Sequence, residues 1–218
     1  MINSVIEVIQ RIADLGGPVV LLLCALSMVV STVILYKLWQ FTAAGVGRHK
    51  ELSRAVAAWD TGDRAAARSY LRKSRSYLCP VVDMAMSGQR DGERLEAETE
   101  TLFAKLERGL RLLDSVAQLA PLLGLFGTVL GMISAFQALQ DAGSKVDPSI
   151  LAGGIWVALL TTAVGLAVAM PTALILSWFE SRMDAERVLA GKALRTILAP
   201  TGQATAAPDV AAGAAIHA

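Results

Sequence analysis

Three long stretches of this 218-residue chain contain no Asp, Glu, Lys, Arg or His. They run from Leu15 to Tyr36, from Ser115 to Gln140 and from Pro148 to Phe179. Because a helix needs roughly 20 apolar residues to cross the hydrocarbon core of a bilayer, each stretch is long enough to do so. The sequence therefore predicts an all-α integral membrane protein with three transmembrane helices.

The charged residues outside these stretches exclude several function classes. The formal net charge is +1, and the basic residues lie among nearly as many acids, which argues against a nucleic-acid partner. Cys24 and Cys79 share no metal-type spacing and two isolated histidines make no metal site, so we expect no metal. The hydrophilic block between the first and second stretches contains no nucleophile–base pair, and its acids and bases are interpreted as solvated helix faces. We therefore do not expect an enzyme.

The basic residues near the ends of the stretches predict the orientation, because Lys and Arg are held on the cytoplasmic side of a membrane. Most of them flank the hydrophilic block or begin the tail, whereas the opposite side has only Arg11 and Lys145. We therefore expect the amino terminus on the periplasmic side and the carboxyl terminus in the cytoplasm.

The chain divides into eight expected segments. They are an amphipathic interfacial helix on the periplasmic side (1–15), the first span (16–41), a cytoplasmic helical domain (42–114), the second span (115–140), a short periplasmic loop (141–147), the third span (148–179), a cytoplasmic helical extension (180–199) and a disordered tail (200–218).

Apolar residues continue the second and third spans into the cytoplasm. A seam of mostly apolar residues recurs at alternating steps of four and three, which predicts one helix from about Glu93 to about Leu139. The seam consists of Leu95, Thr99, Leu102, Leu106, Gly109, Leu113 and Val116. The third span continues into a second apolar stripe, which could pack against the first. It is formed by Met183, Val188, Leu189, Leu194 and Ile197. The cytoplasmic part is thus predicted to be a helical bundle built from extended membrane helices.

Small residues mark the faces on which the second and third spans should pack, since helices in hydrocarbon associate by close contact and interhelical hydrogen bonds. The face of the second span contains Gly124, Gly127, Thr128 and Gly131. The face of the third span contains Gly154, Ala158, Thr162, Gly165 and Ala169. Pro121 and Pro171 each remove one backbone donor, so a local bend is expected at both.

Thr161 and Thr162 lie inside the third charge-free stretch, where hydroxyls can serve in two ways. Each can bond a carbonyl one turn back along its own helix, which threonine does cheaply in membrane helices. Alternatively, they belong to a polar sleeve around a titrating group. Proton and cation carriers usually keep an ionisable side chain at membrane depth, and these stretches have none. Either the chain moves no protons, or another polypeptide supplies the titrating group.

Two long motifs fill the second and third spans. Ala120–Leu139 reads APLLGLFGTVLGMISAFQAL, and Ile150–Pro171 reads ILAGGIWVALLTTAVGLAVAMP. They resemble the second- and third-helix signatures of the ExbB/TolQ/MotA family of proton-channel subunits, and Gly16–Phe41 is a weaker match to the first helix. Because three spans rather than four are predicted, the chain is most similar to the ExbB/TolQ branch and is ExbB-like.

The resemblance implies a homo-oligomer in the bacterial inner membrane, pentameric in ExbB. Its second and third helices would line a pore around single transmembrane helices of an ExbD/TolR-type partner that carry an essential aspartate. The assembly would be a motor that uses the proton motive force and no cofactor. Whether it also binds lipids is left open. It would energise TonB-dependent outer-membrane transport through a TonB-like protein, or a Tol–Pal system as TolQ does.

The resemblance also assigns roles to single residues. Thr128 and Thr162 match the pore threonines of the family, and Thr161 is included beside them on the proton pathway. Helix packing or a kink is expected at Gly124, Gly127, Gly131, Gly165, Pro121 and Pro171.

One position departs from the family pattern. Well-known ExbB and TolQ sequences have a glutamate just before the A-L-L/I of the third-helix motif, and here that position is Val157. Either the glutamate is dispensable, or this protein conducts poorly or differently. A non-conducting membrane scaffold of the same fold stays an alternative. A secondary cation transporter is disfavoured by the lack of intramembrane charge and of an inverted repeat. The energised system, the oligomer number and the identity of the ion stay open.

Overall fold

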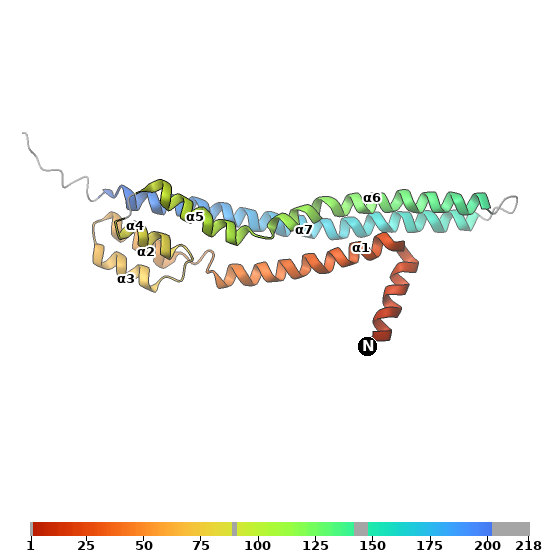
Figure 1. Cartoon of the computed structure of the whole chain (residues 1–218), viewed down its shortest axis with the longest axis horizontal. Helices are drawn as coiled ribbons and strands as arrows, with labels where there is room; N and C mark the ends of the chain where they lie inside the picture. The colour runs from red at the N-terminus through yellow and green to blue at the C-terminus, as the bar shows by residue number, and fades with distance from the viewer. Residues whose placement is uncertain (1, 89–90, 142–147, 202–218) are drawn as a thin grey trace, which may run out of the picture. The chain divides into compact units, whose positions relative to one another are not determined.

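The computed structural model describes residues 2–88, 91–141 and 148–201, and all the regular structure in these ranges is helical (Figure 1). The helices in chain order are α1 (Ile2–Ala43), α2 (Lys50–Asp60), α3 (Arg64–Lys73), α4 (Cys79–Met86), α5 (Gly92–Glu107), α6 (Leu110–Asp141) and α7 (Pro148–Leu198). Three helical segments are long and apolar enough to cross a membrane, at Gly17–Ala43, Leu110–Asp141 and Leu151–Leu198. The predicted all-α chain with three candidate membrane-spanning helices is confirmed.

The chain divides into two compact units. The membrane unit comprises Met1–Leu38 and Arg108–Ser181, and the polar unit comprises Trp39–Glu107 and Arg182–Ala218. Three expectations concern parts outside the described structure: the loop at 142–147, the tail from 202 onward, and the side chains that would form the amphipathic face of the amino-terminal arm.

α1 contains a break at Gly17, next to the expected start of the first span. Gly17 has φ 67° and ψ −172°, a conformation that favours glycine because it has no Cβ atom. Pro18 follows directly, and proline fits the first turn of a helix because the N–H that it lacks would find no helical partner there. The sequence Gly17-Pro18 therefore ends the arm and begins the span.

The single helix expected over about 93–139 is interrupted, so that prediction was wrong. Gly109 lies between α5 and α6 and has φ 94°. A Cβ added to Gly109 would lie 3.5 Å from the Cε atom of Lys37, an ordinary contact, so the positive φ rather than crowding explains the glycine. The predicted apolar seam is buried on both sides of this turn, at Leu95, Thr99, Leu106, Leu113 and Val116.

The polar unit is held together by short helices that pack in pairs and by α7. α2 packs against α3 and α4 against α5. Asp63 caps α3 by accepting a hydrogen bond from the backbone N–H of Ala66 at 2.9 Å. The indole Nε1 of Trp59 donates to the carbonyl of Ile197 at 3.2 Å, and this carbonyl lies in the last turn of α7, where helical partners are missing.

The apolar stripe predicted on the extension of α7 is only partly buried. Met183, Leu194 and Ile197 belong to the core of the polar unit. Val188 is 73% exposed, so its assignment to the buried stripe was wrong. It lines a groove of about 440 Å³ together with residues of α2, which leaves its side chain open.

Candidate functional site

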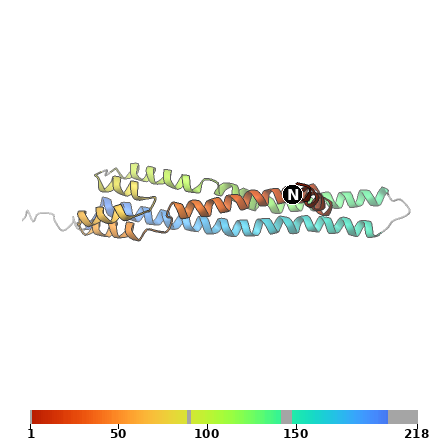
Figure 2. The same ribbon diagram turned by 90° about the horizontal axis from the view of Figure 1, so that it is seen from below.

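α6 and α7 run side by side through the membrane unit and meet on their small residues (Figures 1 and 2). A Cβ atom added to Gly124 would lie 3.0 Å from the Cα atom of Thr162, and one added to Gly131 would lie 3.0 Å from the Cβ atom of Ala158. A Cβ atom on Gly165 would lie 2.6 Å from the carbonyl oxygen of Ala120 on α6. The glycines therefore allow the two backbones to approach more closely than side chains would permit.

Thr161 lies in the middle of this contact. Its side chain is buried, and its Oγ1 atom lies 2.6 Å from the carbonyl oxygen of Ala158 and 3.1 Å from that of Gly124. The first carbonyl belongs to α7 itself, and the second belongs to α6. The hydroxyl of Thr161 thus makes both the local bond that threonine commonly makes in helices and a bond between the two helices.

The other two predicted threonines are differently placed. The Oγ1 atom of Thr162 is buried, and no partner for it occurs within the described ranges. The Oγ1 atom of Thr128 donates to the carbonyl of Leu125 on its own helix at 2.6 Å. Thr162 is therefore the one of the three whose hydroxyl has hydrogen-bonding capacity left entirely unused within the described protomer.

Both predicted prolines lie inside helices that continue through them. Pro121 belongs to α6 and Pro171 to α7. Next to the second proline, the hydroxyl of Thr172 donates to the carbonyl of Val168 at 2.6 Å. Hydroxyls thus bond the backbone near the site as well as within it.

A groove of about 460 Å³ in the membrane unit is lined by all three spans. Val157 and Thr161 line it from α7, one turn apart on the same helical face, and Gly17 and Pro18 line it from the start of the first span. Thr162 does not belong to this lining. The position at which the resemblance expects a glutamate thus lies beside the first span, on a different side of α7 from Thr162.

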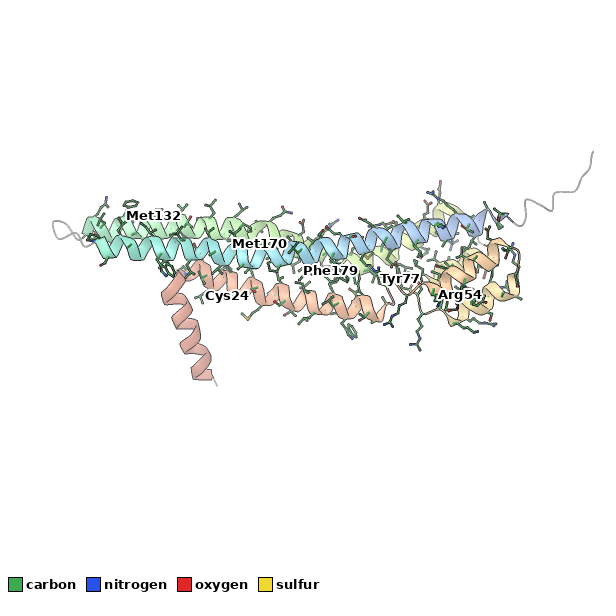
Figure 3. The ribbon with its side chains drawn as sticks, turned by 180° about the vertical axis from the view of Figure 1, so that it is seen from behind. Cys24, Arg54, Tyr77, Met132, Met170 and Phe179 are labelled. Atoms are coloured by element: carbon green, nitrogen blue, oxygen red, sulfur yellow. The ribbon has the colours of Figure 1, made fainter. Side chains whose placement is uncertain are left out.

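A buried polar cluster in the polar unit was missed by the sequence analysis. The Nε2 atom of His49 lies 2.6 Å from a carboxylate oxygen of Glu186, and the hydroxyl of Tyr77 donates to the same oxygen at 3.0 Å (Tyr77 is labelled in Figure 3). The backbone N–H of Gly47 donates to the other carboxylate oxygen at 2.9 Å. The Nδ1 atom of His49 lies 3.0 Å from Ser76 Oγ. The cluster joins the link before α2, the link between α3 and α4, and α7.

This environment changes how the cluster binds protons. Burial by itself raises the pKa of the Glu186 carboxyl, but the hydrogen bond and attraction of His49, with the donors Tyr77 and Gly47, outweigh it and lower the pKa. Burial and the nearby Glu186 carboxylate raise the pKa of Tyr77. The interpretation of the acids and bases of the hydrophilic block as solvated helix faces was therefore wrong for His49, which is buried. No local pattern reveals the cluster, because its members lie far apart in the sequence.

The chain is similar to a family of membrane proteins over most of the region just described. It matches the MotA/TolQ/ExbB proton channel family over residues 59–190. It is 35% identical over 132 residues to a putative biopolymer transport protein ExbB homolog of Methanothermobacter thermautotrophicus, a match that covers 57% of this chain and 46% of that protein. The chain thus spans less than half the length of this relative.

Two further relatives bear the names of two branches of that family. The chain is 27% identical over 175 residues to the biopolymer transport protein exbB1 of Vibrio cholerae, covering 78% of this chain and 76% of that protein. It is 39% identical over 80 residues to the Tol-Pal system protein TolQ of Haemophilus influenzae, covering 37% of this chain and 35% of that protein.

Proposed function

Because the chain belongs to the MotA/TolQ/ExbB proton channel family, on its ExbB/TolQ branch, we propose that it is an ExbB-like subunit of a motor driven by the proton motive force. It is a multi-pass membrane protein, and its proposed place is the bacterial inner membrane, with a periplasmic amino terminus and a cytoplasmic carboxyl terminus. Several copies, a pentamer by resemblance, surround the transmembrane helices of an ExbD/TolR-type partner. The motor energises TonB-dependent outer-membrane transport.

One observation carries this proposal. The three charge-free stretches provide no group that could hold a proton at membrane depth, yet α6 has an exposed threonine hydroxyl there and α7 a buried one without a partner in the described ranges. A channel subunit of this composition needs a titrating acid from elsewhere. The aspartate of a single-span partner supplies it, and the present chain supplies an uncharged wall.

In this mechanism the threonines act on the charged form of the partner's aspartate. The hydroxyl of Thr128 is exposed and can exchange its bond to Leu125 for one to the carboxylate. Thr162 has an unused hydroxyl, which is buried within the protomer and reaches the carboxylate only when its side chain turns outward. Each proton that crosses releases roughly 2.3 kcal/mol per 100 mV of membrane potential. That energy biases the motion of the partner relative to the ring of subunits only if the charged and the neutral aspartate prefer different positions in the pore. Hydroxyls on one side of the pore wall can produce this difference, because they stabilise the charged form where they lie.

The joint substitution Thr128→Val and Thr162→Val tests this assignment, because it removes both hydroxyls with little change in volume. We expect loss of partner-dependent proton flux in proteoliposomes, with the oligomer size unchanged by gel filtration. Thr32→Val is the matched control, since the hydroxyl of Thr32 is exposed and donates to the carbonyl of Met28 on its own helix. Unchanged flux in the double variant would remove these threonines from the pathway.

Two alternatives keep the same fold. The similarity to a TolQ protein favours a subunit of a Tol–Pal system, which would use the same chemistry with another partner. Val157, in place of the glutamate that the resemblance expects, favours a non-conducting membrane scaffold. Partner-dependent proton flux distinguishes the scaffold from both motor functions, because a scaffold shows none.

A further inference from the structure

Thr161 occupies a tight part of the contact between α6 and α7. Its side chain is only 2% exposed, and its hydroxyl lies within hydrogen-bonding distance of one carbonyl on each helix. A hydroxyl carries a single proton, so the two carbonyls of Ala158 and Gly124 share it as a bifurcated donor. That proton is engaged in holding the helices together.

The opposing residue on α6 fits Thr161 only because it is glycine. A Cβ atom on Gly127 would lie 2.7 Å from the Oγ1 atom and 2.8 Å from the Cβ atom of Thr161. Distances of this kind require one of the two helices to shift. The close approach and the interhelical hydrogen bond therefore depend on each other, since neither survives if α6 moves away.

The next residue along α7 has the opposite character. Thr162 Oγ1 is buried but has no partner within the described ranges, and the Cα atom of Thr162 lies against Gly124. Successive residues on a helix point in directions about 100° apart, so fixing the direction of Thr161 also fixes that of Thr162. In hydrocarbon, an interhelical hydrogen bond of this kind is not replaced by water when it breaks.

We infer that Thr161 is a positioning residue that clamps α6 to α7 and thereby sets the direction in which the Thr162 hydroxyl points. This inference rests on the proposed function, in which the Thr162 hydroxyl, buried within the isolated protomer, turns to bond the partner's carboxylate. It separates two adjacent threonines that the sequence motif presents as equivalent: Thr161 acts through the helix contact, and Thr162 acts on the reacting group.

The test compares four variants of the full chain by two readouts, the melting temperature of the purified subunit alone and partner-dependent proton flux in proteoliposomes. Thr161→Val removes the hydroxyl, and Thr161→Ser retains it. Gly127→Ala crowds the contact without removing any hydroxyl. Gly153→Ala is the matched control, because a Cβ atom on Gly153 meets nothing within 4 Å.

The clamp predicts that Thr161→Val lowers the melting temperature by about 2 °C and reduces flux several-fold. Gly127→Ala should reproduce both losses, Thr161→Ser should restore both toward the wild-type values, and Gly153→Ala should change neither. If Thr161→Val fails to assemble while Thr161→Ser assembles, the clamp is supported as well. Full flux in Gly127→Ala would overturn the inference, and so would a flux loss in Thr161→Val at an unchanged melting temperature.

The same experiment separates a failure of this inference from a failure of the proposed function. The melting temperatures need neither the partner nor a proton gradient, so they report the clamp even if no flux is found. Thr162→Val should reduce flux without lowering the melting temperature, because the hydroxyl that it removes makes no hydrogen bond within the described protomer. A lower melting temperature in Thr162→Val would contradict the division of roles.

Discussion

His49 and Glu186 form a buried pair in the polar unit, with 2.6 Å between the imidazole Nε2 atom and a carboxylate oxygen. The pair fastens the link that follows the first span to the extension of the third. Because both groups are buried, removing one leaves the other without its hydrogen-bond partner, which is costly in a protein interior. The pair therefore bears on stability more than any exposed ion pair of the same unit.

Glu186→Gln should destabilise the full chain by about 2 kcal/mol at neutral pH, because a neutral amide replaces a buried carboxylate that accepts hydrogen bonds from Tyr77 and Gly47. Glu51→Gln is the matched control, since Glu51 pairs with Arg54 on the partly exposed surface of α2 and should lose less than about 1 kcal/mol. The melting temperatures of the two variants in detergent, each compared with that of the wild type, measure the two losses of stability. Equal losses would mean that the buried pair contributes no more than a surface pair.

The same carboxyl predicts how stability depends on pH. The pKa of Glu186 lies below its ordinary value of 4.5, so the unfolded chain binds the proton more tightly than the folded chain does. The stabilisation is therefore complete above pH 4.5 and is lost as the pH falls through the lowered pKa of the folded state. The difference in melting temperature between the wild type and Glu186→Gln should shrink over this range. A constant difference would contradict the assignment.

Gly45 should tolerate a side chain less well than Gly62, although both have positive φ values, 70° and 89°. A Cβ atom on Gly45 would lie 2.7 Å from the backbone carbonyl oxygen of Arg75, whereas one on Gly62 would meet nothing within 4 Å. Gly62→Ala should cost about 1 kcal/mol, which is the strain of the backbone alone. Gly45→Ala should cost about 3 kcal/mol, because a backbone segment must also move. Equal costs by thermal unfolding would show that the contact with Arg75 relaxes freely.

Restoring the glutamate of the family at Val157 should not make the subunit conduct by itself. Val157 lines the groove beside the first span, away from Thr162, so a carboxyl there gains no route across the membrane. We expect Val157→Glu alone in liposomes to remain as proton-tight as the wild type, and its partner-dependent flux to stay within about twofold. The uncharged variant Val157→Gln controls for the change in shape. A leak found only in Val157→Glu would place a proton pathway through this groove.

The membrane architecture could be predicted from the sequence because hydrocarbon imposes strict rules. A span must be long and uncharged, and each charge-free stretch therefore overlaps one of the helices that are apolar enough to cross a membrane. The close contact of α6 and α7 through Gly124 and Gly131 lies on the faces that small residues mark, since packing without water selects small side chains.

Other features could not be predicted because they depend on distant partners or on backbone conformation. Gly109 fits a seam of small and apolar residues equally well as a packing residue, and only its positive φ shows that it ends a helix. The pairing of His49 with Glu186 depends on the tertiary fold, because no periodic pattern connects the two positions. Thr161 and Thr162 are identical in the motif, and the difference between their hydroxyls depends on which side chain meets Gly127 and reaches the carbonyl of Gly124.

The central claim is that this subunit is an uncharged wall and that the titrating acid belongs to its partner. The direct measurement is the rate at which an imposed pH gradient decays in liposomes that contain the subunit alone, the subunit with its ExbD/TolR-type partner, or the subunit with a partner whose membrane aspartate is replaced by asparagine. The account predicts fast decay only for the intact pair, with the other two samples no faster than empty liposomes. Decay by the subunit alone at the rate of the intact pair would contradict it.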